Sequence, residues 1–178
     1  MSTLLIAAVL IAAIIAIVVF LISIDKKQKQ NAMNTFFNCL SKTGSLNKLN
    51  FTSQEFLNNI AIGLDAPQRK LLILTRVDRD VYRDRIINLD HVQCCSVKKN
   101  YDYINAGDLK TNRLEKHLEE IVLHMNLYDG SSADIPFYSH INDHISRVIE
   151  TEEKAKRWEA IISSLLNDRF KKNNLKVV

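Results

Sequence analysis

Two histidines four residues apart are the sharpest candidates for chemistry in this sequence. His140 and His144 stand in "HINDH", and on a helix this spacing would place both rings on one face. A zinc protease needs a glutamate directly after the first histidine as its general base, and Ile141 occupies that position. His124, in an expected strand, could be brought near them. The pattern fits surface or capping histidines better, so we predict neither a metal site nor a catalytic residue.

Other catalytic patterns are missing from the sequence. The three cysteines, Cys39, Cys94 and Cys95, form no CxxC pair, and buried thiols in a reducing compartment are expected. Nothing indicates an activated thiolate that would pair Cys95 with a histidine. The glycines are too far apart for a phosphate-binding loop or a nucleophile elbow. We therefore predict a protein that is not an enzyme and needs no cofactor.

The first 24 residues differ sharply from the rest of the 178-residue chain. The run from Leu4 to Ile24 carries no charged side chain and a single polar one, Ser23. As a helix it would be roughly 30 Å long, which matches the hydrocarbon core of a bilayer. It lacks the basic start and the small-residue cleavage site of a secretory signal. We therefore predict that residues 1–24 form an uncleaved, single-pass transmembrane anchor.

Charge on one side of the anchor sets its expected orientation. Basic residues follow the apolar run, at Lys26, Lys27 and Lys29, and none precedes it. Because basic flanks stay in the cytoplasm, we expect the N-terminus outside the inner membrane of a bacterial cell and the C-terminal domain in the cytoplasm. Small residues recur every four positions in the anchor, at Ala8, Ala12 and Ala16. This stripe would let two anchors pack closely, so a homo-oligomer is one expected assembly.

A juxtamembrane segment, residues 25–52, joins the anchor to a folded domain. Its apolar side chains at Met33, Phe36, Phe37 and Leu40 have the spacing of one helical face, and Gly44 is the expected end of that helix. The helix would lie on the bilayer, pack on the domain or pack on its copy in a neighbour. We expect the domain at residues 53–170 and a basic tail at 171–178. "TSQE", from Thr52 to Glu55, predicts the cap of one short helix.

Strand patterns dominate the middle of the chain. "IAIGLD" and "KLLILTRV" predict a hairpin with Pro67 in its turn. Further candidates are "YRDRIINLDHV", "QCCSVKKN" and, more weakly, "YDYIN", while "AGDLKTNRLEKHLE" predicts a long loop or a short helix. "EIVLHMNLYDG" and "ADIPFYS" predict a second hairpin.

The end of the chain is predicted to be helical. Thr151 is the expected N-cap, and residues 139–150 either belong to this helix or precede it as a loop. The predicted buried stripe is Ala155, Trp158, Ile162 and Leu165 or Leu166.

Six or seven antiparallel strands followed by a helix with a central tryptophan resemble the pleckstrin-homology-like superfold. "IAIGLDAPQRKLLILTRV" is similar to the opening hairpin of small bacterial members, and "RIINLDHVQCCSV" to their third strand and its turn into the fourth. The resemblance implies an α+β, mainly β fold class, with a bent antiparallel barrel and a C-terminal helix after the transmembrane anchor.

The resemblance also implies a ligand, because some members bind phosphoinositides through a lysine followed at a distance by Arg-x-Arg. Lys70, Arg83 and Arg85 match that pattern loosely and would contact an anionic head group. Acidic residues are interleaved with these arginines and would repel phosphate, at Asp78, Asp80 and Asp84.

The overall charge is mild, with 24 basic against 20 acidic residues and a net charge of +4, so a dedicated nucleic-acid binder is excluded. The expected function is a single-pass membrane-anchored interaction or scaffold module that presents a pleckstrin-homology-like domain, binding protein partners or self-assembling. An anionic lipid head-group sensor is the first alternative. A small membrane-anchored, metal-dependent hydrolase built on "HINDH" is the second.

Overall fold

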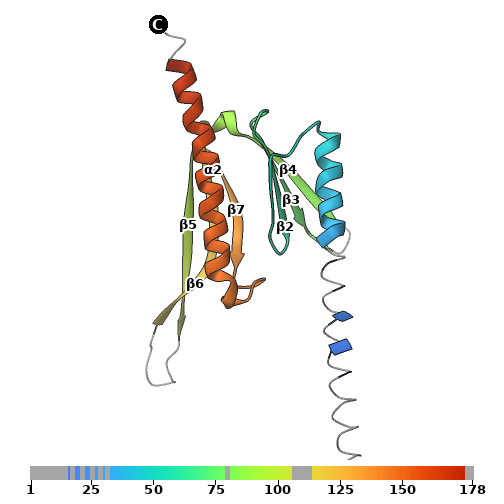
Figure 1. Cartoon of the computed structure of the whole chain (residues 1–178). Coiled ribbons are helices and arrows are strands. Elements are labelled where there is room, and N and C mark those ends of the chain that lie inside the picture. The colour runs from blue at the N-terminus through green and yellow to red at the C-terminus, as the bar shows by residue number, and fades with distance from the viewer. Residues whose placement is uncertain are drawn as a thin grey trace, which may run out of the picture. The chain divides into compact units, whose positions relative to one another are not determined.

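Figure 1 shows a computed structural model of the chain. The structure describes residues 16, 19, 20, 23, 24, 27, 30, 33–78, 81–105 and 114–174. The chain divides into two compact units, Met1–Asn47 and Lys48–Val178.

The first unit contains a helix at residues 33–46. Phe36 and Leu40 are buried, whereas Met33 and Phe37 are exposed, so only half of the predicted apolar stripe is buried. Gly44 lies within the helix, which continues for two more residues, so the predicted end at this glycine is wrong.

The predicted anchor, Leu4 to Ile24, falls mostly outside the described residues. Of its alanine stripe, Ala8 and Ala12 lie outside them as well, and Ala16 is helical and exposed. Among the residues that are described, no helix has both the length and the apolar character that crossing a membrane requires.

Two antiparallel sheets form most of the second unit. The first has the strand order β1-β2-β3-β4, with β1 at Ser53–Phe56, β2 at Ile60–Asp65, β3 at Lys70–Arg76 and β4 at Tyr82–Asn88. After the 3-10 helix η1 (Leu89–His91), the second has the order β5-β6-β7, with β5 at Val92–Asn105, β6 at Leu114–Leu127 and β7 at Ser132–Ser139. Between described residues, no strand of one sheet pairs with the other. The expected barrel is therefore not closed, and two separate sheets take its place.

The helix α2 (Val148–Asn174) follows the 3-10 helix η2 (Ile145–Arg147) and completes an α+β, mainly β architecture, as predicted. It lies along the second sheet in Figure 1 and contacts all three of its strands.

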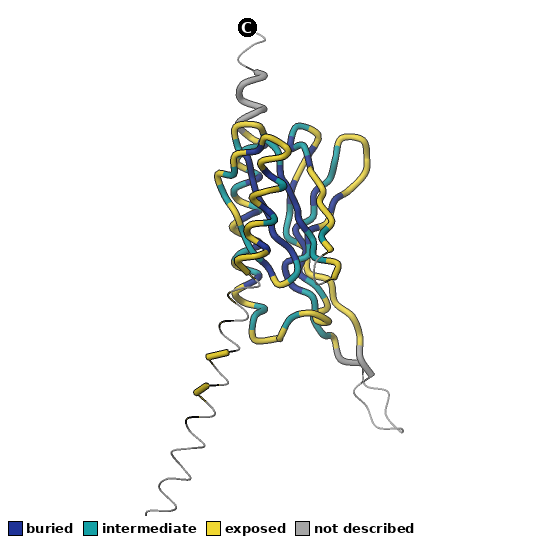
Figure 2. Tube along the Cα trace, turned by 90° about the vertical axis from the view of Figure 1, so that its right-hand side faces the viewer, coloured by how far each residue is buried: buried dark blue, intermediate teal, exposed yellow. Residues whose placement is uncertain are grey.

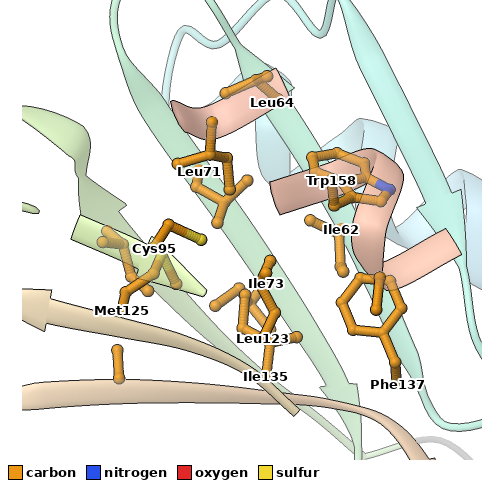
Figure 3. Packing of buried hydrophobic residues seen from close by; sticks show 14 of the residues in the cluster. Ile62, Leu64, Leu71, Ile73, Cys95, Leu123, Met125, Ile135, Phe137 and Trp158 are labelled. Carbon is orange, nitrogen blue, oxygen red and sulfur yellow. The ribbon is translucent and has the colours of Figure 1, made fainter. Parts of the chain in front are cut away.

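The core lies where both sheets meet α2, as Figure 3 shows from close by. Alternate residues of each strand point inward, including Ile62, Leu71 and Ile73 from the first sheet and Leu123, Ile135 and Phe137 from the second. Trp158 of α2 fills the space between them and is 2% exposed. The predicted helical stripe is confirmed, with Leu166 buried and Leu165 partly buried. In Figure 2 the buried residues run through the interior, and the turns at the ends of the strands are exposed.

A buried carboxylate organises the predicted β2–β3 hairpin. Asp65 accepts hydrogen bonds from the backbone N–H groups of Asn50 (2.7 Å) and Gln68 (2.9 Å) and from the Gln68 side-chain amide (2.9 Å). The backbone hydrogen bonds, with that of Gln68 the largest cause, lower the pKa of Asp65. Pro67 lies in the turn, as the sequence indicates.

Arg69, at the end of the same turn, ties together segments that are distant in sequence. Its backbone has the left-handed φ of 55° that few side chains adopt. Its Nε donates to Asp90 Oδ1 of η1 (2.7 Å), and its Nη1 donates to the carbonyl of Leu165 in α2 (2.8 Å). One guanidinium therefore links the first sheet, the connection between the sheets and the C-terminal helix.

Three local predictions are wrong. The "TSQE" stretch is not a helix cap, because Ser53–Phe56 pairs along β2 as an edge strand. Thr151 is not an N-cap, because α2 begins at Val148 and the Thr151 hydroxyl donates to the carbonyls of Arg147 and Val148 inside the helix. Within the stretch predicted as a loop or short helix, the described part from Leu114 to Glu119 is neither, because it lies in the first half of β6, which pairs with β5.

Candidate interaction surface

The residues expected to contact an anionic head group do not converge on one site. Lys70 opposes Asn88 in the β3–β4 ladder, whereas Arg83 and Arg85 oppose Thr75 and Ile73. Neighbouring residues of a strand point to opposite faces, so Lys70 lies on one face of the sheet and both arginines on the other. Arg83 and Arg85 lie on the face of the sheet that also carries Ile73, and Lys70 lies on the opposite face.

The paired histidines lie in a turn and not on a helix. His144 caps η2: its Nδ1 accepts from the backbone N–H of Ser146 (3.3 Å). The His140 ring packs edge-on against His117 of β6, with centroids 5.2 Å apart. The interpretation of capping or surface histidines agrees with these contacts. Across the described residues, no group of three or more His, Cys, Asp or Glu side chains is placed to hold a metal ion.

His124 and Cys94 belong to a polar row on the outer face of the second sheet. The His124 ring nitrogens lie 2.5 Å from Asp134 Oδ1 and 2.8 Å from Asn126 Oδ1, and the Asn126 amide donates to Cys94 Sγ (3.2 Å). Asn126 thus stands between the thiol and the imidazole. The row orders three strands, but it does not form a direct Cys–His nucleophilic pair.

Cys95 points the opposite way, into the core. Burial, with a smaller effect from the Glu159 carboxylate, raises the pKa of its thiol to about 12. At neutral pH Cys95 is therefore a protonated, buried thiol, as expected. Cys94 is exposed and Cys39 is only partly buried, so the expectation of buried thiols is wrong for Cys94 and holds fully for Cys95 alone.

A shallow groove of about 450 Å³ runs between the edge strand β1 and the helix α2. Its floor is mostly apolar and its rim carries hydroxyl groups, with lining residues Thr52, Ser53, Leu64, Ala66, Ala160, Ile161, Ser164 and Leu165. The two walls are joined by an ion pair from Lys154 Nζ to Glu55 Oε1 (3.3 Å), whose side chains are largely buried. The groove thus lies beside a strand that has a neighbour in its sheet on one side only.

Exposed apolar side chains gather at one end of the second unit, here called the apolar end. The apolar end comprises the β3–β4 turn, the outer part of the β5–β6 hairpin and the segment leading into α2. Its exposed apolar side chains are Val77, Val81, Tyr101, Tyr103, Ile141, Ile145 and Ile149. Figure 1 shows the β5–β6 hairpin and the start of α2 at the same end of this unit. The isoleucines are the most exposed, at 86%, 71% and 74% in chain order.

Polar contacts tie the apolar end to the β1–β2 turn and join β5 to α2. The Asn58 amide donates to the carbonyl of Asn142 (2.6 Å), and the backbone N–H of Arg76 donates to the carbonyl of Asn59 (2.8 Å). Lys99 of β5 pairs with Glu152 of α2 at 2.7 Å. Hydrogen bonds from Lys156 and Lys99 lower the pKa of Glu152. The exposed side chains therefore belong to segments that are held in place by polar contacts.

Sequence reasoning missed the apolar end because it concentrated on the histidines of "HINDH". The sequence pattern that indicates this surface lies in the same stretch. Ile141, Ile145 and Ile149 recur every four residues and do not belong to the buried stripe of α2.

No family model, curated protein or solved structure matches this chain.

Proposed function

We propose that this protein is a single-pass membrane-anchored interaction module that presents a pleckstrin-homology-like domain to the cytoplasm and has no catalytic activity of its own. The order of elements supports the architecture: antiparallel strands in two sheets followed by one helix that carries Trp158 into the core. The charge-free run from Leu4 to Ile24 and the lysines after it support the inner-membrane anchor and its orientation.

The groove beside β1 carries the proposal of a protein partner. An edge strand next to a helix is the arrangement to which an extended segment of another chain adds as a further strand, with its side chains entering the adjacent hollow. The apolar floor of Leu64, Ile161 and Leu165 would accept apolar side chains, and the rim hydroxyls of Ser53 and Ser164 would bond to polar groups. The occupant is a partner protein or a second copy of this chain.

The alternatives draw less support from the geometry. A head-group sensor needs Lys70, Arg83 and Arg85 on one face, and a metal-dependent hydrolase needs a third ligand beside His140 and His144.

Site-specific photo-crosslinking of the full chain in its native membrane tests the proposal. A photoreactive amino acid at Ser164, in the groove, should yield a discrete adduct, whereas the same group at Lys156, exposed elsewhere on α2, should not. An adduct of twice the chain mass identifies self-assembly, and any other mass identifies a different partner. Equal labelling from both positions, or none from Ser164, would contradict the groove as the binding site.

A further inference from the structure

We infer that the apolar end of the domain docks on the surface of a lipid bilayer, with its isoleucines inserted at the level of the acyl chains. Exposed apolar patches of this kind mark sites of contact with a membrane or with another protein. Ile141, Ile145 and Ile149 lie in consecutive turns and are each more than two-thirds exposed. This inference rests on the membrane anchor of the proposed function but not on the groove.

The hairpin next to the isoleucines carries side chains suited to a bilayer interface. Tyr101 and Tyr103 alternate along β5 with Asp102, so both rings lie on the side of the sheet that faces α2. Tyrosine has an apolar body and a polar tip, and it is enriched where membranes meet water. The Lys116 ammonium lies 4.1 Å from the centre of the Tyr101 ring, a pair in which the lysine can extend toward head groups.

An ion pair brings the tyrosines and the isoleucines to the same side of the domain. Lys99 contacts Glu152 at 2.7 Å. Tyr101 follows Lys99 by two residues on the outgoing strand, and Ile149 precedes Glu152 by one helical turn in the same direction. The tyrosines and the isoleucines therefore lie at the same end of the domain.

The charges of this surface favour apolar insertion over attraction to anionic lipid. Arg147 lies between Asp143 (3.7 Å) and Glu150 (3.9 Å), and Lys99 is paired with Glu152. These cations are matched by neighbouring carboxylates, so no basic patch results from them. Docking should then depend weakly on salt and on anionic lipid.

The predicted anchor explains why a bilayer is the occupant. A chain held in the membrane by residues 1–24 keeps its domain at high local concentration next to the lipid surface, so a modest apolar contact is enough.

Tryptophan quenching in proteoliposomes tests the docking on the full chain. Trp158 is the sole tryptophan and is buried, so the fluorescence of the wild-type protein gives the background signal. Ile145→Trp places a probe in the apolar end, and Tyr128→Trp is the matched control, since Tyr128 is also exposed but follows β6 at the opposite end. Both variants are reconstituted in phosphatidylcholine vesicles with brominated acyl chains, after flotation confirms that the chain is in the membrane.

We expect the Ile145→Trp emission to shift to shorter wavelength and to be quenched, at low and at high salt alike, while Tyr128→Trp behaves as wild type. Adding Ile141→Ser and Ile149→Ser should reduce the quenching. A protein that floats but whose Ile145→Trp signal is quenched no more than the control overturns the inference alone. A blue shift without quenching would instead mean that a second protein molecule covers the apolar end, which also overturns it. A protein that does not float overturns the anchor and the inference together.

Discussion

The Phe51 ring lies directly over Gly63 of β2, so close that a Cβ at this position would come within 2.6 Å of Phe51 Cε1. Real Cβ atoms do not approach carbon so closely, because the contact is strongly repulsive. Gly63 is therefore required by the packing of the segment that precedes β1, and not by a turn or a positive φ.

The first prediction follows from this contact. Gly63→Ala should destabilise the protein by about 1–3 kcal/mol, because the added methyl group forces Phe51 to move. Combining it with Phe51→Ala should cost less than the sum of the two single changes, since the clash is then absent. Chemical denaturation of all three variants measures this coupling, and strictly additive effects would contradict the contact.

Trp158→Ala should destabilise the protein by roughly 3–5 kcal/mol, because it removes a large aromatic side chain from the junction of both sheets and α2. Trp158→Phe, which keeps an aromatic ring in the site, should cost less. Thermal and urea unfolding of the two variants give the measurement. An alanine variant that unfolds like wild type but loses a partner would mean that Trp158 is a binding residue.

The carboxylate of Asp65 should make stability depend on pH at the acidic end. Its pKa is below the ordinary value of 3.8 in the folded protein because backbone N–H groups stabilise the charged form. Its contribution is therefore fully present above the unfolded pKa and is lost as the pH falls through the lower, folded pKa. Asp65→Ala leaves buried donors unpaired and should cost about 1–3 kcal/mol at neutral pH.

Denaturation of wild type and Asp65→Ala across pH isolates this effect. The difference in unfolding free energy should be constant above about pH 5 and should shrink below the unfolded pKa. A difference that grows on acidification would have the wrong sign for a carboxylate stabilised in its charged form.

The adjacent cysteines should differ in reactivity. Cys94 is exposed, whereas Cys95 is buried with a pKa raised to about 12, so an alkylating reagent at neutral pH should modify Cys94 and spare Cys95. Peptide mass spectrometry distinguishes the two sites, with Cys94→Ser as the control. Both thiols should react once the protein is unfolded, and modification of Cys95 in the native protein would contradict its place in the core.

The predicted anchor, residues 1–24, should remain uncleaved, with the C-terminus in the cytoplasm, because the basic residues follow the apolar run. A reporter that works only in the cytoplasm, fused after Val178, should be active. Activity of a periplasm-only reporter in the same position would reverse the orientation.

Periodic elements of this fold could be predicted from sequence, and elements defined by distant pairing could not. The α2 stripe from Ala155 to Leu166 repeats with the helical period over several turns, and the β2–β3 hairpin is marked by Pro67 between two apolar runs. In contrast, "TSQE" satisfies a helix-capping pattern, yet Ser53–Phe56 is a strand because β2 offers its edge. Local preference is weak enough for such pairing to override it.

The geometry of the candidate sites depends on strand register and on turn structure, which sequence patterns do not specify. Whether Lys70 and Arg85 share a face is decided by the register of β3 and β4, which the residues of each strand do not specify separately. Ile141 and Ile145 lie in a turn and a 3-10 helix, where hydrophobic spacing carries little information about burial. Their position at the same end as Tyr101 depends on the pairing of β5 with β6, which the pattern of each strand does not specify separately.

The position of α2 after all seven described strands has a consequence for synthesis. Trp158, the stripe around it and the Leu165 carbonyl that accepts from Arg69 all belong to α2, which leaves the ribosome after those strands. Until then the apolar inner faces of both sheets are not covered by this helix. Nascent chains that stop before Val148 would therefore expose these apolar faces and be substrates for chaperones and proteases.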